Sequence, residues 1–300
     1  MDATFSRVMS KFSGINNVDS ATRLFPVVID HTYVYPLQEG LNVEIDDTFA
    51  ISSRPGYDNV LAGTGIHSLW ADGEYCFYVD GSVLYRMDAA YTKTSVRTGL
   101  QPDARMSYVR VNDRIYYTNG FQCGYVIGNT STAFPDPARE FKVSLPAGQL
   151  IDYYRGLLLM AKDNILYISD PLCDYYDIRK GYRIFKGNIT MVRSVDDGIY
   201  VSDEKVYFLK GRSNDEFIRD EVYPASAVPF TDVKISGKYI SDDVSGNIAM
   251  WTGESGICLG DNNGKVVNLT EARYKFTAHG RGAAFVREKS NERHYINSLF

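Results

Sequence analysis

The stretch Glu74–Asp88, EYCFYVDGSVLYRMD, decides the fold because it predicts two β-strands joined by a tight turn. Aromatic and β-branched residues fill both halves, and Asp80-Gly81 separates them. A tight hairpin needs positive φ angles at its turn, which glycine adopts at little cost. We therefore expect a β-hairpin centred on Asp80-Gly81.

The same pattern returns along the chain. Further hairpins are predicted with turns at Asn119-Gly120, Asp163-Asn164, Asp203-Glu204, Glu254 and Ser290-Asn291. Most of these turns follow one another at intervals of about 40 residues, which is the length of one four-stranded propeller blade. Short apolar runs precede four of the hairpins and suit the innermost strand of a blade: GIHSLWA, RMSYVRVN, GQLIDYYRG and ITMVRSVD.

These features predict an all-β chain: a β-propeller of about six four-stranded blades over residues 41–300, preceded by an N-terminal arm, residues 1–40. The last unit supplies only two or three strands, and an open sheet edge promotes aggregation. We expect the N-terminal strands within LNVEIDDTFAISSRPG, Leu41–Gly56, to close the ring by pairing there. A pair of β-sandwiches or a solenoid is the alternative. The arm packs either on its own propeller or on a neighbouring subunit.

Composition limits the classes of partner. The chain has 300 residues, 23 Tyr, 15 Phe and a net charge of −5, and no basic run suits a row of phosphates, so no direct nucleic-acid contact is expected. No segment approaches the ~18 apolar residues of a membrane span, and the first residues lack the apolar core of a signal peptide. The cysteines lie far apart without CxxC pairs, which favours buried thiols in a reducing cytosol: Cys76, Cys123, Cys173 and Cys258.

No catalytic, cofactor or metal site is predicted. Adjacent carboxylates could serve glycoside hydrolysis, but in strands they face opposite ways and in turns they cap backbone amides; the pairs are Asp46-Asp47, Asp196-Asp197 and Asp242-Asp243. The histidines lack zinc-binding spacing, and no GxSxG elbow accompanies them: His31, His67, His279 and His294. The run GDNNGK, Gly260–Lys265, predicts a tight turn rather than a calcium loop.

The candidate partner-binding segment is Pro171–Lys186, PLCDYYDIRKGYRIFK, which we interpret as a long insertion between blades. Aromatic anchors with a charged rim are typical of protein interfaces. The residues expected to bind a partner are Tyr175, Tyr176, Arg179, Lys180 and Arg183. Packing between blades is the alternative for the two tyrosines, and it is favoured for Tyr153-Tyr154, Trp70 and Trp251.

Several phrases occur in a fixed order over most of the chain: FSGINNVDSATRL, GLNVEIDDTFAISSRPGY, HSLWADG, GLQPDARMSYVRVNDRIYYTNG, DDGIYVSDEKVYFLKG and GNIAMWTGESGICLGDNNGKVVNLTE. As a set they resemble propeller-type virion structural proteins of tailed bacteriophages. The resemblance implies a non-enzymatic protein, made in the bacterial host cytoplasm, whose symmetric copies join or decorate tail or head-tail junction components in the virion. The alternative is a host-receptor or glycan-binding propeller at the tail tip; a phage-borne glycosidase ranks third.

Overall fold

The computed structural model describes residues 11–46, 48–54, 56, 58–63, 65–240, 244–276, 278, 280–289 and 292–300. Over these ranges the chain forms β-strands and three short 3-10 helices, with no α-helix. No helix within these ranges is long and apolar enough to cross a membrane. The prediction of an all-β chain is confirmed.

Five four-stranded antiparallel sheets are present within the described ranges. The first contains β6 (Ile66–Ala71), β7 (Cys76–Asp80), β8 (Val83–Met87) and β9 (Lys93–Arg97). The second contains β10 (Ser107–Val111), β11 (Arg114–Thr118), β12 (Cys123–Ile127) and β13 (Thr130–Thr132). The third contains β15 (Leu150–Tyr154), β16 (Leu157–Lys162), β17 (Ile165–Ile168) and β19 (Tyr182–Ile184). The fourth contains β20 (Met191–Ser194), β21 (Gly198–Ser202), β22 (Val206–Lys210) and β23 (Ile218–Tyr223). The fifth contains β24 (Val233–Ser236), β25 (Asn247–Gly253), β26 (Gly256–Gly260) and β27 (Val266–Asn268).

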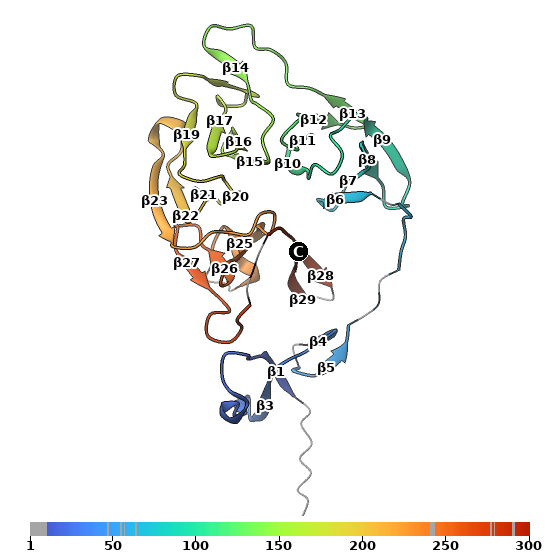
Figure 1. Cartoon of the computed structure of the whole chain (residues 1–300), viewed down its shortest axis with the longest axis vertical. Coiled ribbons are helices and arrows are strands. Elements are labelled where there is room, and N and C mark those ends of the chain that lie inside the picture. The colour runs from blue at the N-terminus through green and yellow to red at the C-terminus, as the bar shows by residue number, and fades with distance from the viewer. Residues whose placement is uncertain are drawn as a thin grey trace, which may run out of the picture.

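The sheets stand around a centre, with β6, β10, β15 and β20 innermost and β9, β13, β19 and β23 on the circumference (Figure 1). The four apolar runs expected to form innermost strands are β6, β10, β15 and β20, so that prediction is confirmed. The hairpin turns from Asp80-Gly81 to Glu254 also fall between paired strands, whereas Ser290-Asn291 lies outside the described residues. Gly81 has a φ of 61°, as a tight turn requires.

Apolar side chains are buried between neighbouring sheets. Leu159 of the third sheet and Ile199 of the fourth belong to one fully buried cluster. Trp251 of the fifth sheet is also fully buried, and its ring lies 5.5 Å from that of Tyr200 in the fourth. Each of these sheets therefore depends on its neighbours for a core. Both tryptophans pack as expected, because Trp70 stacks on Tyr108 at 5.7 Å.

A buried ion cluster joins the inner strands of three sheets. The Arg193 guanidinium lies 2.6 Å from Asp232 Oδ2 and 3.9 Å from Asp152 Oδ1. The other Asp152 oxygen accepts the Ser194 amide at 2.5 Å. Burial opposes the charge of Arg193, but the two carboxylates outweigh it and hold the pKa of the guanidinium above its usual value. These contacts join β15 and β20 to the residue that directly precedes β24.

Within the predicted N-terminal arm, residues 11–37 contain a small three-stranded sheet. β1 (Phe12–Ile15) pairs in parallel with β3 (Thr32–Leu37), which pairs antiparallel with β2 (Val27–Ile29). β1 pairs with a segment about twenty residues further along the chain, so no hairpin signal marks it in the sequence. β3 follows β2 through the two-residue turn Asp30-His31, whose positive φ angles are not marked by a glycine. The Asn17 amide donates to Arg273 O at 3.0 Å, and Asn17 Oδ1 accepts the Lys275 amide at 2.7 Å. The loop after β1 therefore contacts the segment that follows β27 of the same chain.

The last unit differs from the expected closure. β28 (Gly282–Lys289) and β29 (Glu292–Leu299) pair with each other, and so do β4 (Val43–Ile45) and β5 (Ile51–Ser53). In the described part of the chain no backbone pairing joins the two hairpins. β4 and β5 contain three residues each and pair with one another. Glu44 of β4 contacts the last hairpin through an ion pair with Arg287 at 2.8 Å.

Trp251→Ala should lower the free energy of unfolding by about 3–5 kcal/mol, because it removes a fully buried indole from the packing between two sheets. Leu69→Ala is the matched control: this side chain is 70% exposed on β6 and its loss should cost under about 0.5 kcal/mol. Urea unfolding followed by fluorescence or circular dichroism measures both. Equal effects of the two changes would contradict the packing described.

Candidate functional site

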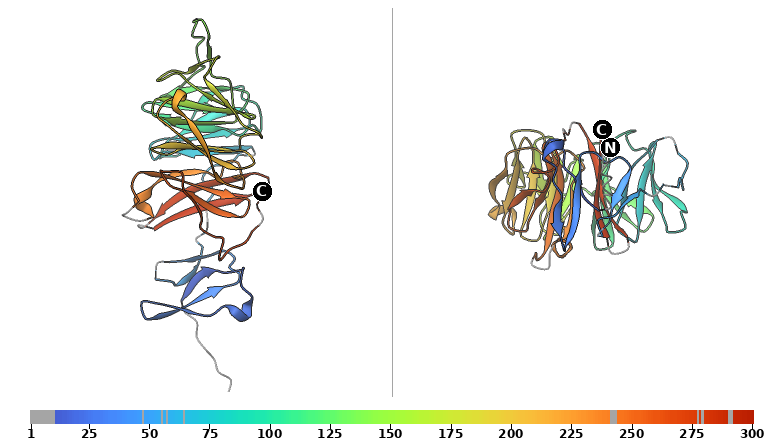
Figure 2. Two further views of the ribbon diagram at one scale, coloured as in Figure 1. Left: turned by 90° about the vertical axis from the view of Figure 1, so that its left-hand side faces the viewer. Right: turned by 90° about the horizontal axis from the view of Figure 1, so that it is seen from below.

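A two-stranded sheet projects from the circumference between the second and third sheets (Figure 1; Figure 2, left). It pairs β14 (Lys142–Ser144) with β18 (Tyr175–Asp177) and is called the rim sheet below. β14 comes from the connection between the second and third sheets, but β18 lies between β17 and β19. The candidate segment is therefore an insertion within the third sheet, and its interpretation as an insertion between blades is wrong.

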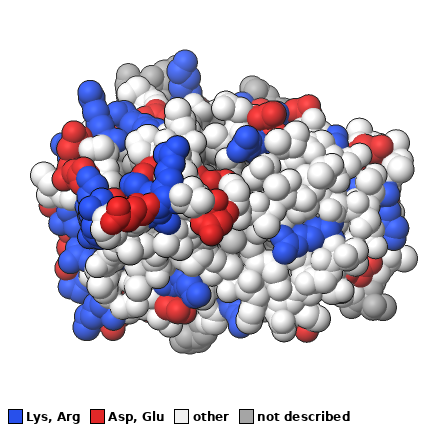
Figure 3. Space-filling model, turned by 90° about the horizontal axis from the view of Figure 1, so that it is seen from above, with Lys and Arg blue, Asp and Glu red and all other residues white. Residues whose placement is uncertain are grey.

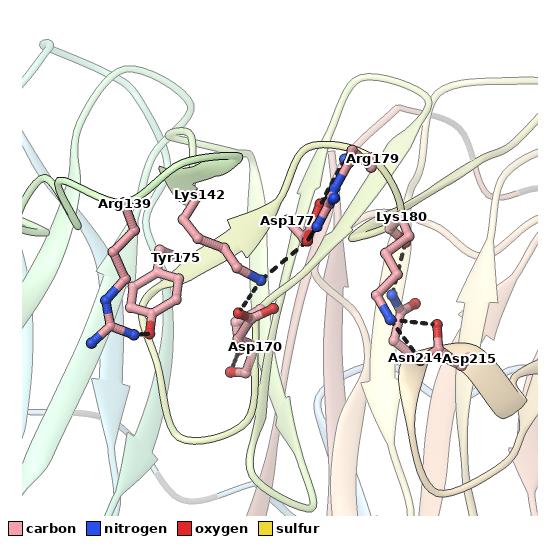
Figure 4. Close-up of polar contacts among 10 residues, drawn as sticks. Arg139, Lys142, Asp170, Tyr175, Asp177, Arg179, Lys180, Asn214 and Asp215 are labelled. Atoms are coloured by element: carbon pink, nitrogen blue, oxygen red, sulfur yellow. Dashed lines mark hydrogen bonds and ion pairs between the residues drawn. The ribbon is translucent and has the colours of Figure 1, made fainter.

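Asp177 holds the rim sheet together. Its side chain is 3% exposed and receives Arg179 Nη2 at 2.7 Å and Lys142 Nζ at 3.2 Å (Figure 4). Lys142 Nζ also lies 2.5 Å from Asp170, just beyond β17. The Arg179 hydrogen bond, with help from Lys142, keeps the pKa of Asp177 far below its usual value. Arg179 and Lys142 thus serve the fold of the insertion.

The two candidate tyrosines have different surroundings. Tyr176 packs edge-on against Tyr167 at 5.1 Å and adjoins a buried cluster between the second and third sheets. Tyr175 OH accepts a hydrogen bond from Arg139 Nη1 at 3.2 Å, and the two side chains lie next to each other in Figure 4. Both tyrosines are half-buried. Tyr176 therefore follows the packing alternative, whereas Tyr175 pairs with an arginine rather than with a ring of that cluster.

Lys180 and Arg183 bridge to the fourth sheet. Lys180 Nζ lies 2.8 Å from Asp215 Oδ2, and its carbonyl accepts Asn214 Nδ2 at 2.8 Å. Arg183 donates to the carbonyls of Tyr182, at 2.9 Å, and Asn214. The 3-10 helix η2 (Asn214–Glu216) presents these partners from the loop between β22 and β23. The five candidate residues thus gather along one insertion, but each already has a partner within the chain.

Three apolar side chains in or next to the rim sheet are about half exposed: Phe141 (42%), which precedes β14, Val143 (47%) on β14, and Ile178 (44%), which follows β18. We call them the rim patch. The Ile178 amide donates to Phe141 O at 3.0 Å, and the Arg179 guanidinium lies 4.3 Å from the Phe141 ring. Sequence reasoning missed Phe141 and Val143, although the alternation Phe-Lys-Val-Ser-Leu over residues 141–145 is a strand signal.

Charged groups surround this end of the molecule unevenly. In the view from above, lysine, arginine and acidic residues of both signs gather over one half of the face, while the other half carries few charges (Figure 3). At the insertion, Lys180 pairs with Asp215 at 2.8 Å, and Lys186 pairs with Glu204 at 2.6 Å. An apolar patch beside paired charges is the composition of a protein interface.

The acidic pairs serve turns and connections. Asp196 accepts both the amide and the side-chain nitrogen of Asn247, at 3.0 and 2.7 Å. Asp197 receives Arg155 Nη2 at 2.7 Å and Asn262 Nδ2 at 2.6 Å, so this turn connects the third, fourth and fifth sheets. Asp46 Oδ1 accepts two backbone amides within its own turn. The remaining members of the three pairs, Asp47, Asp242 and Asp243, lie outside the described residues.

Histidines and cysteines do not assemble into a metal site within the part of the chain that the structure describes. His67 Nδ1 lies 2.8 Å from Ser68 Oγ, and burial lowers the pKa of this imidazole. His279 lies outside the described residues. Cys258 is buried, whereas the other three cysteines are only half-buried, and all four thiols are free. Burial raises the pKa of Cys123 and of Cys258 to about 11, so both stay neutral at pH 7.

The run Gly260–Lys265 forms the turn between β26 and β27. Asp261 Oδ1 accepts the amides of Asn263 and Lys265 at 2.7 and 2.9 Å. This carboxylate caps its own turn, as expected from the sequence.

Comparison with known proteins shows the fold alone. No family model and no curated protein matches the chain. The crystal structure of BBS1N in complex with ARL6DN aligns with a TM-score of 0.54 and 10% identity over 97% of this chain and 94% of that one. The WD40 domain of Neurospora crassa Pan2 aligns with a TM-score of 0.46 and 14% identity over 68% of this chain. The alignment covers 64% of that domain, which is less than two thirds of its length. The WD40 β-propeller domain of Doa1 aligns with a TM-score of 0.45 and 14% identity, over 71% of this chain and 70% of that domain. The five four-stranded sheets arranged around a centre give the chain a β-propeller fold.

Asp177→Asn should lower the melting temperature at pH 7 by a few degrees, because it leaves Arg179 without its carboxylate partner. The folded pKa of Asp177 lies below that of the unfolded chain, so its contribution is present above about pH 4 and is lost as the pH falls through the folded pKa. The difference in melting temperature between the two proteins should therefore shrink below pH 4.

Asp215→Asn, in the exposed pair with Lys180, is the control and should change little at any pH. Thermal melts from pH 3 to pH 8 measure all three proteins. A difference between wild type and Asp177→Asn that stays constant over this range would show that the carboxylate does not hold the rim sheet.

Proposed function

We propose that this chain is a non-enzymatic structural component of a tailed-bacteriophage virion, which joins or decorates tail or head-tail junction proteins through protein-protein contacts. The observation that carries the proposal is the rim patch on a sheet that projects from the disc (Figure 2, left). The ordered phrases that resemble phage virion proteins support the same setting. Several symmetric copies in the particle are part of the proposal.

A projecting two-stranded sheet suits a contact surface. The third sheet continues from β17 to β19 regardless of the insertion, so the insertion can change without loss of the sheet. Its own ion pairs at Asp177 fix its conformation before a partner binds, which lowers the entropy lost on binding. Phe141 and Ile178 then supply apolar area at the centre, with Arg179 and Tyr175 around them.

The rim patch predicts a separation between folding and assembly. Phe141→Ala with Ile178→Ala should leave the melting temperature within a degree or two but weaken partner binding about 30-fold or more, since truncating one interface anchor commonly costs about 2 kcal/mol. Tyr176→Ala should instead lower the melting temperature by several degrees, because its ring packs on Tyr167. Ile218→Ala, 65% exposed on β23, is the control for exposed apolar area.

The assay combines thermal melts with mass spectrometry of purified particles after complementation by each variant. Normal incorporation of the folded Phe141→Ala, Ile178→Ala protein would remove the rim patch as the contact. Binding of the isolated wild-type protein to host cells or purified glycans would favour the receptor-binding alternative at the tail tip. Turnover of a host polysaccharide would overturn the non-enzymatic assignment.

We further propose that the ring has six blades and that β4 and β5 complete the last one. Arg287 and His294 stand opposite each other in the β28–β29 register, and Arg287 Nη2 lies 3.0 Å from His294 Nδ1 and 2.8 Å from Glu44 Oε1. The contact of Glu44 with Arg287 brings β4 to the β28–β29 hairpin, and the blade order that we propose is β28, β29, β4, β5. β5 would then lead to β6 from an outermost to an innermost strand, as the chain does between the other sheets.

Deleting residues 1–54 should expose the outer edge of β29 and cause aggregation, because unpaired edges template association. The control is deletion of residues 1–40, which removes β1 to β3 but keeps β4 and β5. Size-exclusion chromatography and thermal melts compare the two. If the longer deletion is as monomeric and as stable as the shorter one, the proposed closure is wrong.

A further inference from the structure

The strand β2 lies at an open edge of the three-stranded N-terminal sheet. The strand order is β1, β3, β2, and within the described part of the chain no strand pairs with the second edge of β2. This sheet lies at one end of the molecule (Figure 1). An unpaired strand edge is a template for pairing with another chain.

The backbone of Val28 is directed to this open edge. β2 and β3 are joined by the two-residue turn Asp30-His31, with φ angles of 46° and 63°. A turn of this type is closed by a hydrogen-bonded pair, here Ile29 with Thr32, and the residues along the strand then alternate in direction. The amide and the carbonyl of Val28 therefore point away from β3 and toward the open edge.

Apolar side chains on both faces of β2 are exposed. Val27 is 52% exposed and Val28 is 56% exposed, and Phe25, which precedes the strand, is 71% exposed. No charged residue lies within Val27–Ile29, although a charge on an edge strand is a common protection against association. Pairing with a further strand removes part of this apolar area from water.

The charges at the two ends of β2 match those of a second copy of the chain. Arg23 lies before the strand and Asp30 lies directly after it, and both side chains are exposed. A two-fold axis at Val28 makes the strands antiparallel, so the end with Arg23 in one copy meets the end with Asp30 in the other. A parallel pair places like charges together, so the charges favour the two-fold arrangement. Exposed ion pairs add little affinity, and their effect here is on the strand direction.

We propose that β2 pairs antiparallel with β2 of a second copy of this chain, with Val28 at the two-fold axis. The Val28 amide of each copy donates to the Val28 carbonyl of the other, and Val27 of one copy lies opposite Ile29 of the other. Pro26 has no amide hydrogen, so the contact is short and the dimer dissociates on dilution. The proposal depends neither on the rim patch nor on a virion setting, because it rests on the N-terminal sheet alone.

Sedimentation of the full chain tests the pairing, and we expect a change from monomer to dimer between about 1 and 200 µM. Val28→Lys places two ammonium groups opposite each other at the axis and should weaken the dimer about tenfold or more. Circular dichroism checks that this variant is folded. Val267→Lys is the matched control and should leave the dimer unchanged, because Val267 is 43% exposed on β27, at the edge of the fifth sheet.

Further variants test the antiparallel register. Directly opposite residues have Cα atoms about 5.5 Å apart, which a disulfide can span. Val28→Cys should therefore give a covalent dimer on oxidation, whereas Val267→Cys should not. Arg23→Asp should weaken the dimer about fivefold, because it places like charges together at both ends of the pair. Addition of Asp30→Asn, which suits the same turn, should recover part of this loss.

Three results overturn the proposal. The first is a wild-type chain that stays monomeric at about 200 µM. The second is a folded Val28→Lys protein that dimerises as the wild type does. The third is equal cross-linking of the Val28→Cys and Val267→Cys proteins.

Discussion

Face-to-face packing of neighbouring sheets is the constraint on which the whole molecule depends. Leu159 meets Ile199, and Tyr200 meets Trp251, so that each core belongs to two sheets rather than one. A ring built in this way fixes the strands and leaves the loops and insertions free to vary. The rim sheet is made from such connections, which is why we propose it as the contact surface of this protein.

Polar contacts at the inner strands also join neighbouring sheets. The Arg193 guanidinium lies beside two carboxylates, Asp152 and Asp232. The Asp196-Asp197 turn is bonded to Asn247 of the fifth sheet and to Arg155, which follows β15 of the third. These acids resemble a catalytic pair in the sequence, but in the structure their oxygens are used by the protein itself.

Local patterns in the sequence predict the hairpins well, because a turn such as Asp80-Gly81 and its two strands lie within one short stretch. Pairing between distant segments leaves no such signal. The sequence therefore did not predict the pairing of β1 with β3 or of β14 with β18. Because β14 was not expected, Phe141 and Val143 of the rim patch were not expected either. The candidate segment was found from its composition, but composition could not show that Arg179 and Lys180 would be held by Asp177 and Asp215. Closure of the ring was expected from backbone pairing of the strands in residues 41–56 with the last hairpin. Among the described residues, the contact between β4 and that hairpin is the ion pair of Glu44 with Arg287 on β28.

A density map of the assembled phage particle tests the central proposal most directly. We expect disc-shaped density of this size in several symmetry-related copies at the tail or the head-tail junction, with Phe141, Val143 and Ile178 buried against another virion protein. A particle that lacks the disc, or one in which the rim patch faces solvent in every copy, would contradict the proposal.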